Sequence, residues 1–231
     1  MKENPFKRSV ATLLVIALLM TLFPTSALAF SGAIDNAEIG TPQDTWPLGD
    51  GLQATRYYKY EDGTSTFSLV IHKDPSADVG ATFRMPDYQD ASEAPWSQDN
   101  YLFRNIYIEE GVTHIGQNAF NGFTNATYAE IPSSVTSIGA SAFQSVSKAS
   151  FSDGTEEGKL DLSNVTSLGD HAFYACSLIT EVELGSALSA IPAYTFCATG
   201  LTELEIPGSV KTVGQNAFSS CSSLTSVALD E

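Results

Sequence analysis

The stretch IPSSVTSIGASAF, residues 131–143, contains the pattern that decides the fold. Val135 and Ile138 are apolar and three positions apart, Gly139 follows at once, and a small residue precedes Phe143. The same order recurs in five copies, whose final Phe residues are 23, 30, 23 and 22 positions apart: Phe120, Phe143, Phe173, Phe196 and Phe218. Self-similarity at a nearly fixed period is the signature of a repeat architecture, so the sequence predicts an array of similar units.

A second signal precedes the copies and predicts strands. The segments LTELEI (201–206), ITEVEL (179–184) and FRNIYI (103–108) each end in four residues that alternate in polarity. Alternation with period two is typical of β-strands. A strand in each unit and a period of about 23 residues predict a leucine-rich-repeat solenoid, in which stacked coils form a parallel β-sheet with short helical or turn segments. The glycine of each unit is expected where the chain turns sharply, because glycine lacks a Cβ.

The repeat unit closely resembles the bacterial BspA-like leucine-rich repeat. Residues 131–143 carry the likeness most clearly, and residues 206–218 and 106–120 also match well. The resemblance covers residues 101–231 strongly and extends more weakly over residues 55–100. Three features depart from the pattern: the 30-residue step, Pro192 in the place of a glycine, and Ala126 in the place of a leucine.

The first residues have the layout of a secretory signal peptide. Basic residues start the chain, residues 10–23 are almost wholly apolar, and the small residues Ala27 and Ala29 fit a cleavage site before Phe30. The alternative is an N-terminal membrane anchor, but this apolar run is shorter than the roughly 20 residues that span a bilayer. We therefore expect residues 1–29 to be removed, the remainder to stay out of the membrane, and the protein to be secreted or held at the cell surface.

Residues 30–100 are interpreted as a β-rich N-terminal cap for a repeat array over residues 101–231, which holds about five coils. The end of a solenoid has an unpaired edge that a cap must cover. Tyr88 and Trp96 are expected to cover the first coil. The alternative is that this region is an independent binding domain.

Within that region the sequence predicts one β-hairpin. Residues 56–60 and 66–71 are rich in apolar and aromatic side chains, and Asp62-Gly63 lies between them. Asp-Gly between such runs is a strong signal for a tight turn. Residues 31–55 are rich in Gly, Pro, Asp and Thr, and we expect them to be extended or loosely ordered.

The sequence contains no recognisable catalytic, metal-binding or cofactor-binding motif. The cysteines are expected to be buried thiols, because Cys176 and Cys221 hold equivalent places two coils apart, about 9–10 Å, and Cys197 is out of phase with both. His114 and His171 occupy variable repeat positions and are expected to be solvated. We therefore expect a protein that is not an enzyme and that has no catalytic residues, no metal and no cofactor.

Net charge limits the possible partners. The chain has 27 acidic and 11 basic residues and a formal net charge of −16. Nucleic-acid binding needs a basic surface, so the composition argues against a nucleic-acid partner.

Carboxylates are concentrated on the outward face of the predicted sheet. In a strand, residues between the inward apolar positions point outward. Glu183 and Glu205 should then be cross-strand neighbours about 4.8 Å apart, as should Glu181 and Glu203. The candidate ligand-binding residues on this concave face are Tyr107, Tyr128, Glu130, Asp161, Glu181, Glu183, Glu203 and Glu205. The alternative is a solvated face whose like charges, which repel by about 1 kcal/mol per pair in water, splay apart.

Two functions fit these observations. The first, which the family resemblance implies, is a secreted or cell-surface binding module of the adhesion type. It would recognise a protein or glycan ligand through the acidic face, and that ligand would be basic. The second is a structural, self-assembling surface protein or a fragment of a longer repeat array, because the strand signal at residues 224–229 has no obvious polar cap after it.

Overall fold

The computed structural model describes residues 39–78, 80–151 and 158–230. All of them belong to one compact unit, which spans residues 32–231. The signal peptide expected over residues 1–29 lies outside the described residues. Strands dominate the described part of the chain, which holds only one short 3-10 helix, η1. The elements are β1 (Thr41–Gly49), β2 (Leu52–Glu61), β3 (Thr64–Lys73), η1 (Ser97–Leu102), β4 (Phe103–Ile108), β5 (His114–Ile115), β6 (Tyr128–Ala129), β7 (Ser137–Ile138), β8 (Lys159–Leu162), β9 (Ser167–Leu168), β10 (Glu181–Leu184), β11 (Ala190–Ile191), β12 (Glu203–Ile206), β13 (Thr212–Val213) and β14 (Ser226–Leu229).

Strands β1, β2 and β3 form an antiparallel sheet. Asp62 and Gly63 make the two-residue turn between β2 and β3, with φ angles of 50° and 80°. Two successive positive φ angles suit a tight hairpin, so the hairpin prediction is confirmed. Residues 31–55 were expected to be extended or loosely ordered, and where β1 and the start of β2 occupy this region the chain is extended. There the backbone ladder and the packing of Trp46 against the core hold the chain in a strand.

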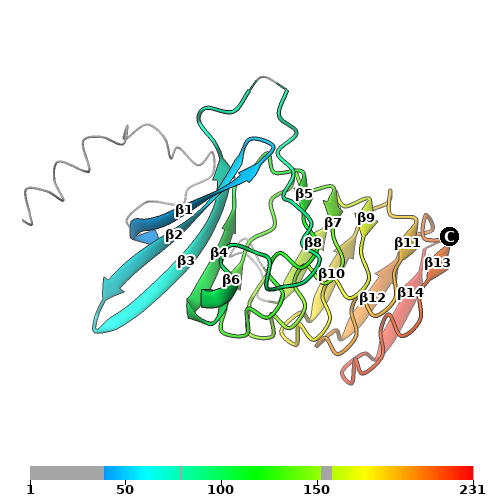
Figure 1. The fold of residues 1–231 in the computed structure, drawn as a ribbon. Coiled ribbons are helices and arrows are strands. Elements are labelled where there is room, and N and C mark those ends of the chain that lie inside the picture. The colour runs from blue at the N-terminus through cyan, green and yellow to red at the C-terminus, as the bar shows by residue number, and fades with distance from the viewer. Residues whose placement is uncertain (1–38, 79, 152–157, 231) are drawn as a thin grey trace, which may run out of the picture. The chain divides into compact units, whose positions relative to one another are not determined.

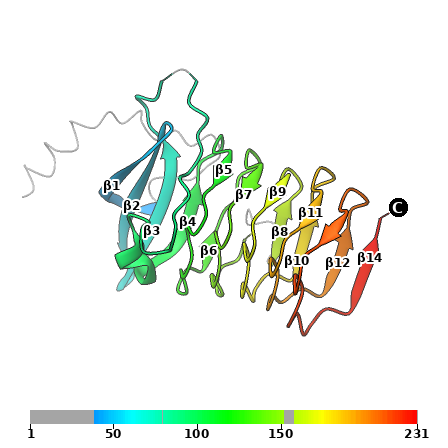
Figure 2. The same ribbon diagram turned by 45° about the vertical axis from the view of Figure 1, so that its right-hand side comes forward.

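From β3 onward the strands pair in parallel and follow one another in chain order (Figures 1 and 2). Each repeat contributes to two rows of strands. The first row contains β4 with β6, β8 with β10, and β12 with β14. The second row contains the two-residue strands, as β5-β7-β9 and β11-β13. The space between the rows is filled by the apolar side chains of both.

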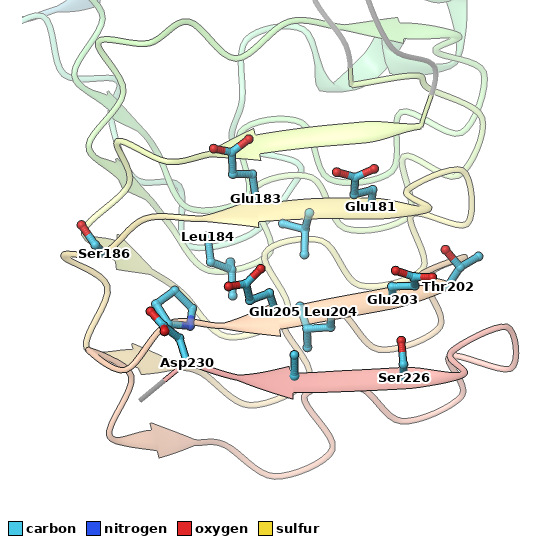
Figure 3. Close-up of a pocket in the computed structure, with 13 residues that line it drawn as sticks. Glu181, Glu183, Leu184, Ser186, Thr202, Glu203, Leu204, Glu205, Ser226 and Asp230 are labelled. Atoms are coloured by element: carbon cyan, nitrogen blue, oxygen red, sulfur yellow. The ribbon is translucent and has the colours of Figure 1, made fainter.

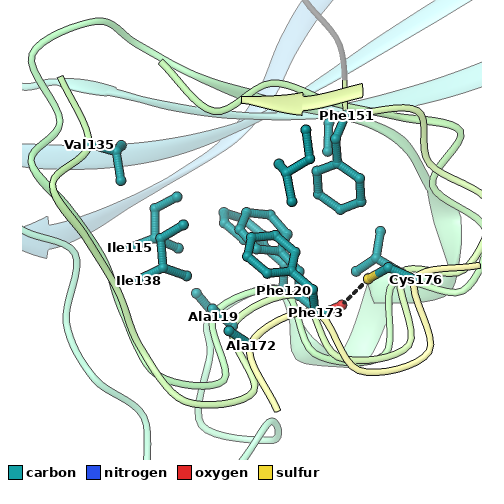
Figure 4. Close-up of a cluster of buried hydrophobic side chains, with 14 of the residues drawn as sticks. Ile115, Ala119, Phe120, Val135, Ile138, Phe151, Ala172, Phe173 and Cys176 are labelled. Atoms are coloured by element: carbon teal, nitrogen blue, oxygen red, sulfur yellow. Dashed lines mark hydrogen bonds between the residues drawn. The ribbon is translucent and has the colours of Figure 1, made fainter. Parts of the chain in front are cut away.

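A ladder of phenylalanine rings lies at the centre of this core (Figure 4). The ring of Phe120 stacks on that of Phe143 with centroids 5.2 Å apart, and Phe143 stacks on Phe173 at 5.5 Å. The ladder continues to Phe196 at 5.7 Å and to Phe218 at 5.8 Å. Aromatic pairs of this kind contribute about 0.5–1.5 kcal/mol beyond the burial of their surface. The repeated phenylalanine therefore joins each coil to the next.

Trp96 continues the ladder on the side of the N-terminal sheet. Its ring stacks on Phe120 at 6.0 Å, and its indole Nε1 donates a hydrogen bond to the carbonyl of Ala119 at 2.8 Å. Tyr88 packs edge-on against Trp96 at 6.1 Å. Both side chains are buried, and the indole N–H has the partner that a buried donor requires.

The repeat glycines are needed because they lack a Cβ, as expected, and the structure shows which contact requires this. Gly116, Gly139, Gly169 and Gly214 do not have positive φ angles. A Cβ on Gly139 would instead collide with the backbone of Gln117 in the preceding coil, and the other three would collide in the same way with the neighbouring backbone. These glycines therefore allow adjacent coils to approach closely.

Left-handed backbone occurs elsewhere in each coil, mostly on residues other than glycine. The residue two positions before each ladder phenylalanine has a φ angle between 54° and 59°: Asn118, Ser141, His171, Tyr194 and Asn216. The residue two positions after each ladder phenylalanine also has a positive φ angle: 82° at Gly122, and 59–64° at Ser145, Ala175, Ala198 and Ser220. The tight turn around the phenylalanine thus depends on these positions.

Pro192 explains a break in the row of short strands. In three coils the glycine N–H donates to the carbonyl of the isoleucine one coil earlier, as Gly139 does to Ile115 at 2.8 Å. Proline has no N–H and cannot make this bond. The row is interrupted between β9 and β11, which is where Pro192 follows β11.

The cysteines are free thiols. Cys176 and Cys197 are buried, and Cys221 is half-buried. The Cys176 thiol donates to the carbonyl of Phe143 at 3.1 Å, and burial raises its pKa well above the usual range. Cys221 makes the equivalent bond to Phe196, also at 3.1 Å.

Candidate functional site

The acidic face is built by strands β8, β10 and β12. Alternation places Val182 and Leu184 of β10 inside and leaves Glu181 and Glu183 outside. The same order recurs in β12, where Glu203 and Glu205 point outward. Two neighbouring repeats therefore present four exposed carboxylates at matching positions (Figure 3).

One lysine contacts this group of carboxylates. In the parallel register of β8 and β10, Lys159 lies opposite Glu181 and Asp161 lies opposite Glu183. The Lys159 Nζ is 3.3 Å from a carboxylate oxygen of Glu183 and 3.9 Å from one of Glu181. These side chains are partly exposed, so each pair stabilises the fold by no more than about 1 kcal/mol. No such contact joins Glu203 or Glu205 to a cation among the described residues.

Strands β10 and β12 are neighbours, and Thr202 donates its N–H to the carbonyl of Thr180 at 3.0 Å just before them. The hydrogen-bonded ladders join β10 to β8 and β12 to β14 and leave a gap between β10 and β12. Like charges opposite one another destabilise a strand pair, so the facing glutamates oppose a ladder at this gap.

A cavity of about 590 Å³ lies over this gap. We call it the acidic groove. Its lining includes Glu181, Glu183, Glu203 and Glu205, with Asp230 at one end. Polar side chains from the loops and strands complete it, among them Ser186, Thr202 and Ser226 (Figure 3). The groove thus collects negative charge from three neighbouring repeats.

The structure divides the eight residues predicted from the sequence. Four line the acidic groove: Glu181, Glu183, Glu203 and Glu205. The other four lie outside it. Tyr107 and Tyr128 pack against each other with ring centroids 5.3 Å apart, and the Tyr128 hydroxyl donates to Glu130 at 3.3 Å. Asp161 accepts a hydrogen bond from the N–H of Ser163 at 2.8 Å, which closes the turn after β8.

Sequence reasoning missed Asp230 as a groove residue. The sequence contains the pattern that indicates this position. Ser226, Ala228 and Asp230 are two positions apart, so they lie on the same face of the strand, as the outward glutamates do. Its N–H donates to the carbonyl of Ile206 at 2.9 Å, which extends the pairing of β12 and β14 by one residue.

The expectation of a solvated His114 is wrong. Its side chain is buried, with 7% of the residue exposed, because the neighbouring coils cover it. Its Nδ1 lies 2.7 Å from the Ser137 hydroxyl, and its Nε2 lies 3.3 Å from a carboxylate oxygen of Asp87. Partial burial raises the pKa of Asp87, but hydrogen bonds from the Gln117 N–H and from His114 outweigh it and lower the pKa below its usual range.

The described residues contain neither a cluster of metal ligands nor a membrane-spanning helix. No three or more His, Cys, Asp or Glu side chains in residues 39–78, 80–151 and 158–230 are grouped as ligands for a metal ion. In the same residues, no helix has the length and apolar character needed to cross a membrane.

Comparison with known proteins identifies the repeat. Residues 145–231 match the family model described as BspA type Leucine rich repeat region (6 copies). A leucine rich cell surface protein from Faecalibacterium prausnitzii has a similar structure, with a TM-score of 0.53 and 23% identity over 82% of this chain and 55% of that one. A leucine-rich repeat protein from Bacteroides ovatus gives a TM-score of 0.46 and 18% identity over 74% of this chain and 51% of that one.

The chain spans about half the length of these two structures. No curated protein matches it. The likeness to the Faecalibacterium prausnitzii protein shows that the described residues have a leucine-rich-repeat fold. The family recognised from the sequence is confirmed, and the chain carries a BspA-type leucine-rich repeat region.

Proposed function

We propose that this chain is a cell-surface binding module whose acidic groove takes a ligand that carries positive charge. The observation that carries the proposal is the gathering of Glu181, Glu183, Glu203 and Glu205 around one hollow. Among the described residues, Lys159 is the one cation that pairs with this group, and it reaches only Glu181 and Glu183. A basic side chain of a protein ligand, or an amino group of a glycan, would relieve their mutual repulsion on binding.

The repeat architecture supports this role. We propose that the stacked repeats form a solenoid that holds the groove in a fixed shape, and that residues 30–100 act as its N-terminal cap. The stacking of Trp96 on Phe120 supports the cap. A preformed groove loses little conformational entropy when a ligand binds, so its affinity for the right ligand is higher.

Family membership and the start of the sequence support a location outside the cell. The Faecalibacterium prausnitzii protein of similar fold is described as a cell surface protein. Residues 1–29 have the composition of a secretory signal. Adhesion to a host protein or to a glycan is the use that fits such a module.

The test compares two variants that lose the same charge. One carries Glu183→Gln and Glu205→Gln in the groove. The control carries Glu61→Gln and Glu110→Gln, two exposed carboxylates outside it. Fluorescence anisotropy with a labelled decalysine peptide should show a Kd about tenfold higher for the groove variant and nearly unchanged for the control, because charge-assisted contacts of this kind are worth about 1.4 kcal/mol together.

The same pair of variants should then be tested on a panel of host matrix glycoproteins and bacterial surface glycans, at low and at physiological salt. Binding that weakens with salt and is lost only in the groove variant supports the proposal. If both variants bind every probe as tightly as the unaltered chain does, the groove is only a solvated face.

A second proposal rests on the edge of β14. All four residues of this strand are exposed, including Val227 at 50% and Leu229 at 73%, and Val213 nearby is 50% exposed. An exposed apolar edge strand is a template for pairing with another strand. This edge favours a structural role in which it meets another repeat, in a longer array or in a second copy. If light scattering reports a monomer at every concentration, self-assembly through this edge is excluded.

A further inference from the structure

Two cations from different coils converge on one asparagine. Arg104 is the second residue of β4, Asn125 lies in the turn before β6, and Lys148 occupies the same place one repeat later. The Arg104 Nη1 donates to the backbone carbonyl of Asn125 at 2.9 Å. The Lys148 Nζ donates to the side-chain Oδ1 of the same residue at 3.2 Å. Both headgroups therefore belong to one surface patch.

Asn125 is itself held in place. Its Nδ2 donates to the backbone carbonyl of Tyr101 at 3.0 Å, at the end of η1. This bond fixes the orientation of the amide and so aims Oδ1 at Lys148. Arg104 is anchored as well, because its carbonyl accepts the N–H of Thr127 at 2.7 Å. The two cations are positioned by the fold before any ligand arrives.

The patch has no carboxylate partner in the described part of the chain. Elsewhere in that part most cations are matched: Arg56 with Asp44 and Asp99, Lys59 with Glu61, Lys73 with Glu109, and Lys159 with Glu183. Within the described residues neither Arg104 nor Lys148 forms such an ion pair, although the full chain has 27 acidic and 11 basic residues. Both residues are exposed, and each donates one hydrogen bond to Asn125, fewer than its headgroup can make.

We propose that Tyr101, Arg104, Asn125 and Lys148 form a binding site for an anionic saccharide. Guanidinium and ammonium groups are the donors that proteins use for sulfate, phosphate and carboxylate oxygens. Tyr101 is 56% exposed, and its backbone carbonyl holds the Asn125 amide, so an exposed aromatic residue belongs to the same contact network as these donors. A sugar ring that carries a sulfate or carboxylate group uses both features, whereas an acidic peptide needs only the charges. This site and the acidic groove would take ligands of opposite charge, so they are independent.

Titration calorimetry of the full chain tests the site with four probes: dextran sulfate, polygalacturonate, neutral dextran and polyglutamate. The sulfated and carboxylated polysaccharides separate the two anionic groups, and polyglutamate tests a peptide in place of a sugar. We expect binding to at least one charged polysaccharide, no binding to neutral dextran, and weaker binding to polyglutamate. Arg104→Gln or Lys148→Gln should raise the Kd about tenfold.

The matched control is Lys211→Gln, which removes the same charge from an exposed lysine whose Nζ donates to the carbonyl of Gly208. It should leave the Kd within about twofold. A further variant, Tyr101→Ala, should weaken the polysaccharides more than polyglutamate. Thermal unfolding of each variant confirms that it is folded.

Three results would overturn the proposal. One is the absence of binding to both charged polysaccharides. The second is an equal loss of affinity in the Lys211→Gln control, which would mean attraction without a site. The third is polyglutamate binding that is as tight as polysaccharide binding and indifferent to Tyr101→Ala, which would replace the saccharide with an acidic peptide.

Discussion

Glycine and left-handed residues occupy different places in each coil, so exchanging them should have opposite effects. Gly139→Ala places a Cβ against the backbone of Gln117, and the coils must separate to admit it. We expect a loss of about 1–3 kcal/mol in the free energy of unfolding, the usual cost of overpacking a tight contact. Ala175 has a φ angle of 59°, so Ala175→Gly relieves left-handed strain of about 1–2 kcal/mol but adds entropy to the unfolded chain.

Urea denaturation measures both effects. Gly139→Ala should lower the midpoint clearly, and Ala175→Gly should leave it unchanged or raise it slightly. A stable Gly139→Ala variant would show that close approach does not explain the repeat glycine. The repeat pattern located this glycine and its lack of a Cβ, but it could not show the contact with Gln117, because that residue lies 22 positions earlier.

The contact between buried His114 and exposed Asp87 predicts an acid-dependent loss of stability. Hydrogen bonds from Gln117 and His114 lower the pKa of Asp87 below its usual range. A carboxyl whose pKa is lower in the folded state stabilises the fold above its unfolded pKa, and this stabilisation is lost as pH falls through the folded value. Asp87→Asn should therefore flatten the fall in the unfolding midpoint below about pH 4, with little change in its slope near neutral pH. If the unfolding midpoint of Asp87→Asn falls below pH 4 as steeply as that of the unaltered chain, Asp87 does not stabilise the fold in this way.

At the scale of elements, Pro192 should be the cause of the break between β9 and β11. Pro192→Gly restores the N–H that the other coils use for this hydrogen bond. We expect the amide of the new glycine to be protected in hydrogen exchange to the same degree as that of Gly214, which donates to Ile191 at 2.7 Å. If the new amide exchanges as fast as an exposed loop amide, another feature of the fourth coil breaks the row.

The elements that the sequence predicted well are those fixed by local pattern. Alternation marked β10 and β12, and Asp62-Gly63 marked the β2–β3 hairpin. Strand β1 was missed because its residues, which include Pro42 and Pro47, look like a loop until Trp46 packs against the core and β2 supplies a partner. The gap between β10 and β12 was also hidden, since the ladders form only after the coils stack.

At the scale of the whole molecule, the candidate site was predicted only in part, because the sequence pattern shows which residues share a face but not which side chains meet after folding. The period of the repeat put Glu181, Glu183, Glu203 and Glu205 on one face, and the groove contains all four. The period could not show that Tyr128 and Glu130 bond to each other outside it, nor that Asp230 closes one end. It also could not place Arg104 beside Lys148, because their meeting depends on the turns at Asn125.

Charge repulsion across the acidic groove should make the whole molecule more stable in salt. The chain has a net charge of −16, and Glu203 and Glu205 face the glutamates of β10 without a cation of their own in the described residues. Salt screens exposed charges over about 8–10 Å at physiological strength, so the thermal midpoint should rise with added sodium chloride. Glu205→Gln should raise the midpoint at low salt by the equivalent of up to about 1 kcal/mol, and the difference from the unaltered chain should shrink as salt increases.

The control Glu61→Gln removes a carboxylate that is paired with Lys59 and should not stabilise the chain. A gain from Glu205→Gln that is the same at every salt concentration would mean that the groove carboxylates do not repel one another, and that the gap between β10 and β12 has a steric cause.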